Sequence, residues 1–569
     1  MRLLGALVWV AAAFPQSVPL KDRVLILVND RVPESVSVGQ YYAAKRNIPG
    51  ANILHLKTSA AEQISQEEYK DQIEAPVRKF LDAGDGAMRR KILYIVPTYG
   101  VPLKIAQQFA VDSVLVMMYA GHESDKPPLR NPYAAPTGSR PPHFAEWSDT
   151  VAAANNFKMF VVTRLDGPSA EIAKGLVDKA IQAETSLTMK SGVAYFDSQG
   201  TRHPEEWQFA IDGEIKAASE LSRKAGFNTV LNVQAGSLCG NMFPPPAQYL
   251  YDAANKRTTV DALGATAGVT FAFQPMAQGD FTFRAENGGV QNTGNSITLT
   301  LQAASEKSYV RFFYPFVPFK QWNTSDEIVL EKVVDGAIAA RIAVPVKNDE
   351  KTMNQFSALR LAVRNTRIVA YRDASEVAAV EDKSGKPLNL EKASLSANCW
   401  TFGIKGLSVA DAAGAPLWDD NFATDSTARY QWQMSPRRGV NALWVWGWYG
   451  GAFDSYRFVP GAVGAQLTSF TADRIRTPLN ADPKMYSFGS ARWGGNWVPR
   501  MLEQGVTATW GAVTEPYAVF YAPGGNVFDH LWAGYNFGDS FYIAQNAVRW
   551  VMVAVGDPLY SPQVFARPR

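Results

Sequence analysis

Apolar residues in the first 240 positions form short continuous runs that alternate with stretches of helical periodicity. The first run covers residues 24–28, and a run of this length is typical of a parallel strand buried on both faces. Ser65 and Glu68 have the spacing of a capping box, which predicts that a helix begins after Ser65. Strands separated by helices indicate βαβ units with right-handed crossovers. The sequence therefore predicts an α/β fold with a mostly parallel sheet flanked by helices.

The pattern changes after about residue 240, where three prolines stand at positions 244–246. From there to about residue 435, short alternating segments are separated by Gly, Asn, Asp and Ser turns, which favours a β-sandwich. The α/β pattern returns after Gly439. We therefore predict an all-β sandwich (241–435) inserted into one α/β domain made of residues 19–240 and 436–569. Seven strands are expected to share one sheet: 24–28, 92–96, 159–162, 193–196, 442–446, 465–468 and 506–510.

Residues 1–18 have the pattern of a secretory signal peptide. Arg2 precedes an apolar run at residues 3–14, and the alanines at 11–13 offer a small-residue cleavage site. The run is too short to cross a bilayer, which needs about 20 residues. We expect an exported protein (periplasmic, cell-surface or extracellular) without a transmembrane anchor in the mature chain.

Charge and rare residues narrow the range of partners. The 569 residues include 56 basic and 53 acidic side chains, a net charge of +3, which lacks the basic excess typical of nucleic-acid binding. Neither Cys239 nor Cys399 belongs to a CxxC motif, and whether the two pair is left open. The five histidines are scattered without metal-ligand spacing, so we expect no metal and no cofactor.

Four segments near the C-terminal end follow one another in an order that resembles a known catalytic domain. They are LWVWGWYGG at 443–451, GAQLTSF at 464–470, GVTATWGAVTEP at 505–516 and VGDPL at 555–559. The order resembles gingipain-type cysteine peptidases, which share the caspase-like fold. In that family one strand leads into a Gly-His-Gly turn with the catalytic His, and the next strand ends in the catalytic Cys. The resemblance implies a caspase-like α/β fold with a pocket at these strand ends.

The two catalytic places of that family hold other residues here. Trp448 stands in the His place and cannot act as a base, because its indole N–H only donates. Ser469, or its neighbour Thr468, stands in the Cys place, and a Ser without an adjacent base is a weak nucleophile. The resemblance therefore implies the fold and the pocket but no cysteine-peptidase activity.

A second resemblance covers residues 23–235 and 436–565. Segments such as YYAAKRNIPGANI, FVVTRLDGP and GAVTEPY are similar to those of an uncharacterised family of exported bacterial proteins that occurs with the exosortase/PEP-CTERM sorting system. That family implies no established activity. This chain departs from its shorter members by the large insert and by the lack of a C-terminal sorting tail.

Polar residues at the carboxyl ends of the predicted strands are the candidate pocket, because ligands of open α/β sheets bind at this edge. Arg164 and Asp166 form either an anion clamp together with Ser469 or a structural ion pair. Asp112 is interpreted as a helix cap, and Asp557 as a turn residue. Alternate residues Trp444, Trp446 and Trp448 share one face of a strand, as a core layer or as a sugar platform. The full candidate set is Asn29, Asp30, Thr98, Asp112, Arg164, Asp166, Asp197, Ser469 and Glu515.

Three functions remain open from the sequence. The first is a non-catalytic scaffold that binds a polypeptide or a cell-surface polymer such as a polysaccharide. The second is a hydrolase that uses Ser469 with an acid such as Glu515, which requires a base within hydrogen-bond reach of Ser469. The third is a glycan-binding surface protein that binds through the inserted β-domain.

Overall fold

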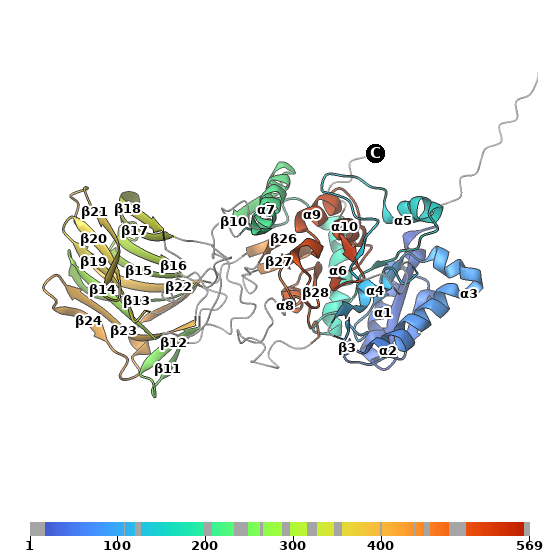
Figure 1. The fold of residues 1–569 in the computed structure, drawn as a ribbon, viewed down its shortest axis with the longest axis horizontal. Coiled ribbons are helices and arrows are strands. Elements are labelled where there is room, and N and C mark those ends of the chain that lie inside the picture. The colour runs from blue at the N-terminus through green and yellow to red at the C-terminus, as the bar shows by residue number, and fades with distance from the viewer. Residues whose placement is uncertain are drawn as a thin grey trace, which may run out of the picture.

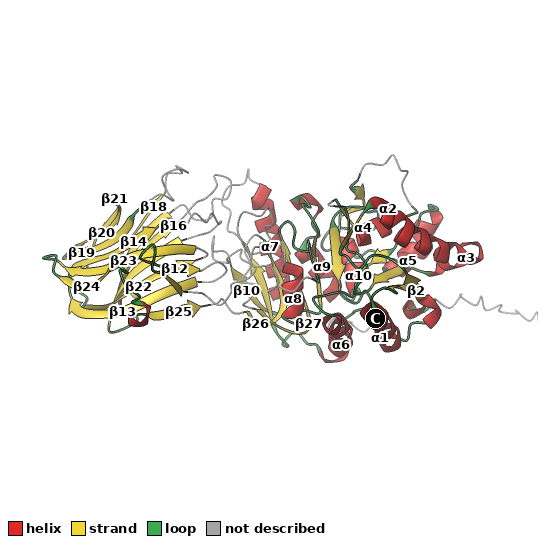
Figure 2. Cartoon of the chain, turned by 90° about the horizontal axis from the view of Figure 1, so that it is seen from below, coloured by secondary structure: helices red, strands yellow, loops and turns green. Residues whose placement is uncertain are grey.

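The computed structural model describes residues 18–106, 108–119, 127–198, 207–232, 249–261, 266–286, 296–315, 327–345, 356–398, 401–435, 439–448, 456–476 and 497–562. The predicted signal peptide, except for Val18, and both cysteines lie outside these residues. The described chain combines an α/β part with an all-β part, and each part has its own hydrophobic core. Figure 1 and Figure 2 show the two parts as separate bodies of the ribbon.

The first sheet of the α/β part has four parallel strands in the order β2-β1-β4-β8. Its central strand β1 is buried along all six residues, which explains its continuous apolar sequence. The strands are β1 (Val24–Asn29), β2 (Ile53–Leu56), β4 (Tyr94–Pro97) and β8 (Val161–Val162).

The second sheet has six strands in the order β10-β9-β26-β27-β28-β30. Its first five strands run parallel and β30 runs antiparallel to β28. Strands β9 and β26 pair across the whole all-β segment of the sequence. The strands are β9 (Val193–Asp197), β10 (Asn228–Asn232), β26 (Gly439–Trp448), β27 (Tyr456–Leu467), β28 (Ala508–Ala512) and β30 (Met552–Val555).

The prediction that seven strands share one sheet is wrong. Strands β1, β4 and β8 belong to the first sheet, whereas β9, β26, β27 and β28 belong to the second. The two sheets meet at a single parallel bridge between Arg164 and Val555, where Arg164 N donates to Ala554 O at 2.9 Å and Gly556 N donates to Arg164 O at 2.9 Å. Because β8 has only two residues, the ladder is too short to merge the sheets into one.

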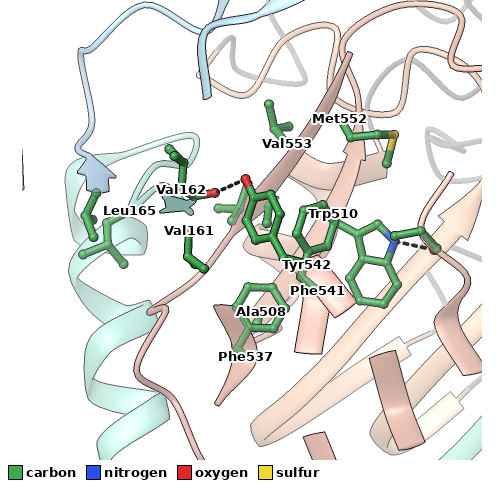
Figure 3. Close-up of a cluster of buried hydrophobic side chains, with 14 of the residues drawn as sticks. Val161, Val162, Leu165, Ala508, Trp510, Phe537, Phe541, Tyr542, Met552 and Val553 are labelled. Carbon is green, nitrogen blue, oxygen red and sulfur yellow. Dashed lines mark hydrogen bonds between the residues drawn. The ribbon is translucent and has the colours of Figure 1, made fainter. Parts of the chain in front are cut away.

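Large apolar side chains fill the junction between the two sheets (Figure 3). In the view of Figure 3, Tyr542 and Phe541 lie between Val162 of the first sheet and Trp510 of the second, and the ring centres of Phe541 and Trp510 are 6.3 Å apart. The hydroxyl of Tyr542 donates to Val162 O at 3.0 Å, and the Trp510 indole donates to Ala522 O at 3.1 Å, so both buried polar groups are satisfied. This packing makes the two sheets one hydrophobic core.

Helices cover both sheets. Helix α1 packs on β1 and against α6, which also contacts β27, and α7 packs on β9 and α9. The capping box predicted at Ser65 is present: its hydroxyl accepts from Glu68 N, and the Glu68 side chain accepts from Ser65 N. The helices are α1 (Pro33–Arg46), α2 (Gln66–Tyr69), α3 (Ala75–Lys91), α4 (Val111–Leu115), α5 (Phe144–Trp147), α6 (Ala170–Ser186), α7 (Trp207–Lys224), α8 (Trp497–Glu503), α9 (Gly524–Trp532) and α10 (Phe537–Ala544).

The all-β part consists of two antiparallel sheets that enclose a core of alternate apolar residues. One sheet, called the seven-stranded sheet below, has the order β18-β17-β16-β15-β22-β13-β25. Its strands are β13 (Thr266–Met276), β15 (Ser296–Ala303), β16 (Tyr309–Pro315), β17 (Glu327–Val334), β18 (Ala337–Pro345), β22 (Leu390–Asn398) and β25 (Gln431–Ser435).

The other sheet, called the eight-stranded sheet, has the order β11-β12-β23-β14-β19-β20-β21, with β24 paired to β23. Its strands are β11 (Tyr249–Asp252), β12 (Arg257–Asp261), β14 (Gly279–Glu286), β19 (Ala358–Arg364), β20 (Arg367–Arg372), β21 (Ser375–Glu381), β23 (Thr401–Asp411) and β24 (Pro416–Asp420). The short strands β3 (Gln63–Ile64), β5 (Lys104–Ile105), β6 (Phe109–Ala110), β7 (Leu129–Arg130) and β29 (Ala547–Val548) lie in the α/β part.

Candidate functional site

A cavity of about 580 Å³ lies at the carboxyl ends of β26 and β27. Helix α7 forms one wall, Trp446 of β26 and the residues that end β27 form the floor, and the segment after β28 forms the other wall. Most of the lining is aromatic or aliphatic. The lining residues are Ala210, Ile211, Glu214, Trp446, Leu467, Thr468, Ser469, Glu515, Pro516, Tyr517, Ala518, Val519, Tyr521 and Pro523.

Ser469 and Glu515 meet in this cavity. The Ser469 hydroxyl, which is nearly buried, donates a short hydrogen bond to the Glu515 carboxylate. The second oxygen of that carboxylate accepts from Tyr517 N at 3.0 Å. The Trp550 indole donates to Pro516 O at 2.9 Å and holds the segment in place. Two of the predicted site residues are therefore brought together, although 46 positions separate them in the sequence.

Glu214 is a site residue that the sequence reasoning missed. It lies on α7, and its two carboxylate oxygens accept from the Trp446 indole at 2.6 Å and from Gly525 N at 2.9 Å. Burial raises the pKa of Glu214 to about 7, although both hydrogen bonds act to lower it. An acid at the helical spacing of Ile211, Ile215 and Ala218 was the available signal, because such a position faces the protein interior.

Arg164 belongs to a buried ion cluster at the junction of the two sheets. Its guanidinium donates to Asp112 at 2.6 and 2.9 Å and to Asp166 at 2.8 Å, and all three side chains are at most 1% exposed. Arg476 also donates to Asp166 at 3.2 Å. Burial raises the pKa of the Asp112 carboxyl, and Arg164 acts in the opposite direction.

The cluster corrects two interpretations. Asp112 lies inside α4, which begins after Ala110, so its carboxylate holds Arg164 rather than capping the helix. The partners of Arg164 are Asp112, Asp166 and the Pro102 carbonyl, whereas Ser469 bonds to Glu515, so the anion clamp with Ser469 is not formed. The structural ion pair of Arg164 and Asp166 is confirmed.

Three candidates lie at the edge of the first sheet, away from β27. The Asn29 amide donates to Gly100 O at 2.9 Å, and the Thr98 hydroxyl contacts Ser35 at 2.9 Å, so both hold loops together. Asp30 pairs with His55 at the surface. These contacts leave the first sheet's residues out of the cavity.

The remaining candidates lie on the second sheet and at the C-terminal turn. Asp197 ends β9 and is 5% exposed. Trp448 is the last residue of β26, and its side chain is not among those that the structure describes. Trp444 and Trp446 are at most 1% exposed, which confirms the core interpretation for these two. Asp557 accepts from Leu559 N at 2.9 Å, as expected of a turn residue, and it also binds Tyr42 and Arg46.

Within the described ranges, no group of three or more His, Cys, Asp or Glu side chains is arranged to hold a metal ion. In the same part of the chain, every helix is too short or too polar to cross a membrane.

No model of a known protein family matches the chain, and no curated protein matches it. Matches to solved structures exist. Sheep galectin-11 in complex with glycerol has 8% identity, covers 25% of this chain and 95% of its own, and gives a TM-score of 0.19. A Bacillus subtilis protein of unknown function with a galectin-like fold has 12% identity, covers 28% of this chain and 82% of its own, and gives a TM-score of 0.21. A prokaryotic β-1,3-1,4-glucanase from a mouse hindgut metagenome has 10% identity, covers 26% of this chain and 77% of its own, and gives a TM-score of 0.18. Because these TM-scores are low, the matches assign no function to this chain.

Proposed function

We propose that this protein is an exported, caspase-like scaffold without peptidase activity, and that its cavity binds an apolar segment of a polypeptide. The observation that carries the proposal is the cavity itself. It has the size of a ligand site, its walls are largely aromatic and aliphatic, and its polar lining residues are Thr468, Ser469, Glu214 and Glu515.

A polypeptide fits this lining better than other polymers do. Apolar side chains of a bound segment would cover Tyr517 and Val519, which are 59% and 68% exposed, and burial of apolar surface drives such association. The carboxylate of Glu515 accepts hydrogen bonds, and backbone N–H groups of a peptide supply donors. A cell-surface polysaccharide supplies hydroxyl donors but few side chains that would fill an apolar cavity of about 580 Å³.

The cavity lacks the groups of a cysteine peptidase. Its lining residues include no cysteine and no histidine. His530 is fully buried elsewhere, and its ring nitrogens contact the carbonyls of Asn526 at 2.9 Å and Ser139 at 3.0 Å. The imidazole that deprotonates a nucleophile in such enzymes therefore has no counterpart beside Ser469 among the residues that line the cavity.

An array of random hexapeptides tests this proposal on the full chain. We expect retained peptides to share one or two large apolar side chains, and the same peptides with those side chains changed to Ser to be lost. An array on which apolar peptides are retained no better than their Ser-substituted forms would overturn the proposal.

A second candidate function is a hydrolase, and the Ser469–Glu515 hydrogen bond favours it. Glu515 provides an acceptor for the Ser469 proton, and Glu214, with its pKa near 7, would be a proton donor across the cavity. Peptide and ester substrates decide between the two functions. The scaffold proposal expects no turnover by the wild-type protein; turnover that is present in the wild type and lost in Ser469→Ala would establish the hydrolase instead.

A further inference from the structure

The outer face of the seven-stranded sheet carries a continuous row of polar side chains. The registers of adjacent strands align one residue from each strand. We call this set the polar row: Arg341, Glu331, Arg311, Thr300, Ser394, Thr270 and Gln431. Residues on either side of Thr300 along β15, Leu299 and Leu301, are fully buried in the sandwich core. Since side chains alternate along a strand, the polar row points away from that core.

The charge that the polar row presents to solvent is positive. The Glu331 side chain is only 6% exposed, and it accepts from Arg311 at 2.6 Å and lies 3.6 Å from Arg341. The side chains of Arg311 and Arg341 are 43% and 51% exposed. A buried carboxylate thus holds two guanidinium groups in place while about half of the surface of the two arginine side chains stays exposed.

Aromatic rings accompany the charges. Tyr309 lies two residues before Arg311 on the same strand, its hydroxyl donates to Glu331 at 3.3 Å, and the Arg311 guanidinium lies 5.5 Å from the centre of its ring. Phe313 lies two residues after Arg311 and is half-buried. Both rings share the outer face with the polar row, because residues two apart lie on the same side of a strand.

We propose that the polar row is a binding site for an acidic polysaccharide, that is, a sugar chain that carries carboxylates. Neighbouring strands lie about 4.8 Å apart, which is close to the length of one sugar ring. A sugar chain that crosses the strands therefore meets one polar side chain under each ring. Arg311 and Arg341 receive the carboxylates by charge-assisted hydrogen bonds, and Thr300, Ser394 and Thr270 receive hydroxyls. This site goes beyond the proposed function, since it lies on the all-β part.

The eight-stranded sheet provides a matched control. There Asp280 binds Arg364 at 2.9 Å and Arg360 at 3.3 Å, and Arg360 lies 3.9 Å from the ring centre of Tyr371. The residues in register with Asp280 are Ala362 and Ala410, but two residues further along β14 a polar row does cross this sheet, through Asp419, Ser408, Thr282, Arg360, Tyr371 and Glu376. That row carries two carboxylates and one guanidinium, whereas the polar row of the seven-stranded sheet carries two guanidinium groups and one buried carboxylate, so the two sheets offer rows of opposite net charge.

Binding of the full chain to polygalacturonate, measured by affinity electrophoresis, tests the proposal. We expect retardation by polygalacturonate and little by dextran, which is neutral. Arg341→Gln should weaken binding about tenfold or more. The double variant Arg311→Gln/Glu331→Gln, which leaves no unpaired buried charge, should weaken it similarly. Arg360→Gln/Arg364→Gln should bind like the wild type, because it removes two charges from the other sheet.

Four results would overturn the proposal. They are no retardation by polygalacturonate, equal retardation by dextran, equal losses in the variants of the two sheets, and binding of single-stranded DNA that falls in the same variants. Thermal unfolding of each variant separates a lost site from a lost fold, and Thr300→Val supplies a second test that leaves the charges unchanged. An intact Thr300→Val protein with wild-type affinity would also contradict a contact along the row.

Discussion

Replacing Glu214 by Gln changes how the stability of the α/β part depends on pH. The pKa of Glu214 rises from 4.5 to about 7 in the folded protein. Between these values the folded chain keeps a proton that the unfolded chain has lost, so the free energy of unfolding falls as the pH rises through this window. The stabilisation that the proton provides is complete below about pH 4.5 and is lost above about pH 7.

The size of the effect follows from the shift. The difference between 4.5 and about 7 corresponds to roughly 3 kcal/mol, since one pKa unit is worth about 1.4 kcal/mol. A Gln at this position has no charge to desolvate, so the variant does not lose this stability. Its amide can accept from only one of Trp446 and Gly525, which costs about 1 kcal/mol at every pH. At pH 5 the wild type has already lost about 1 kcal/mol of this stabilisation, so we expect Glu214→Gln and the wild type to differ little there, and we expect the variant to be more stable by about 2 kcal/mol at pH 8.

Urea denaturation followed by tryptophan fluorescence at pH 5 and pH 8 measures the two differences. Glu220→Gln is the control, because Glu220 lies on the exposed side of the same helix. The control should shift the free energy of unfolding little and equally at both pH values. A difference between wild type and Glu214→Gln that stays constant from pH 5 to pH 8 would refute the assignment of a raised pKa to Glu214.

Other predictions concern the ion cluster, the cavity wall, the cysteines and export. Arg164→Ala should lower the free energy of unfolding by about 3–5 kcal/mol, because it leaves Asp112 and Asp166 buried without their partner. Arg31 is exposed, so Arg31→Ala is the control, and equal denaturation midpoints of the two variants would contradict this prediction. Gly524→Ala should destabilise by about 1–3 kcal/mol, because its Cβ would lie 2.2 Å from the Trp446 ring, and an unchanged melting temperature would count against this contact. Thiol-directed active-site probes should label neither cysteine of the native protein, as peptide mass spectrometry would reveal. The mature protein should begin near residues 14–18 in its host, and an intact Met1 would exclude this cleavage.

Local signals predicted individual elements well. The strand at residues 24–28 was recognisable because burial on both faces leaves only apolar residues, and the helix after Ser65 because its capping box is a local hydrogen-bond pattern. The return of buried strands after Gly439 likewise indicated that β26 belongs with the earlier α/β elements, and it pairs with β9.

These local signals could not predict which strands and side chains that lie far apart in the sequence meet in the fold. Periodicity predicts that residues 159–162 form a strand but not that only two of them enter the ladder, and this shortness is what separates the two sheets. Ser469 was named from a resemblance and Glu515 from its strand end, yet their contact depends on the order of β27 and β28. Glu214 was missed because its partner Trp446 lies 232 positions away, beyond the all-β segment.

The most direct test of the central claim is the affinity of a peptide selected on the hexapeptide array for three forms of the full chain. Ala210 lines the cavity from α7, so Ala210→Trp fills the cavity without entering the core, and Ala217→Trp places the same ring two turns further along the helix, outside the lining. A binding site in the cavity predicts that Ala210→Trp raises the Kd about tenfold or more, while Ala217→Trp leaves it unchanged. Equal Kd values for the wild type and Ala210→Trp would contradict the claim.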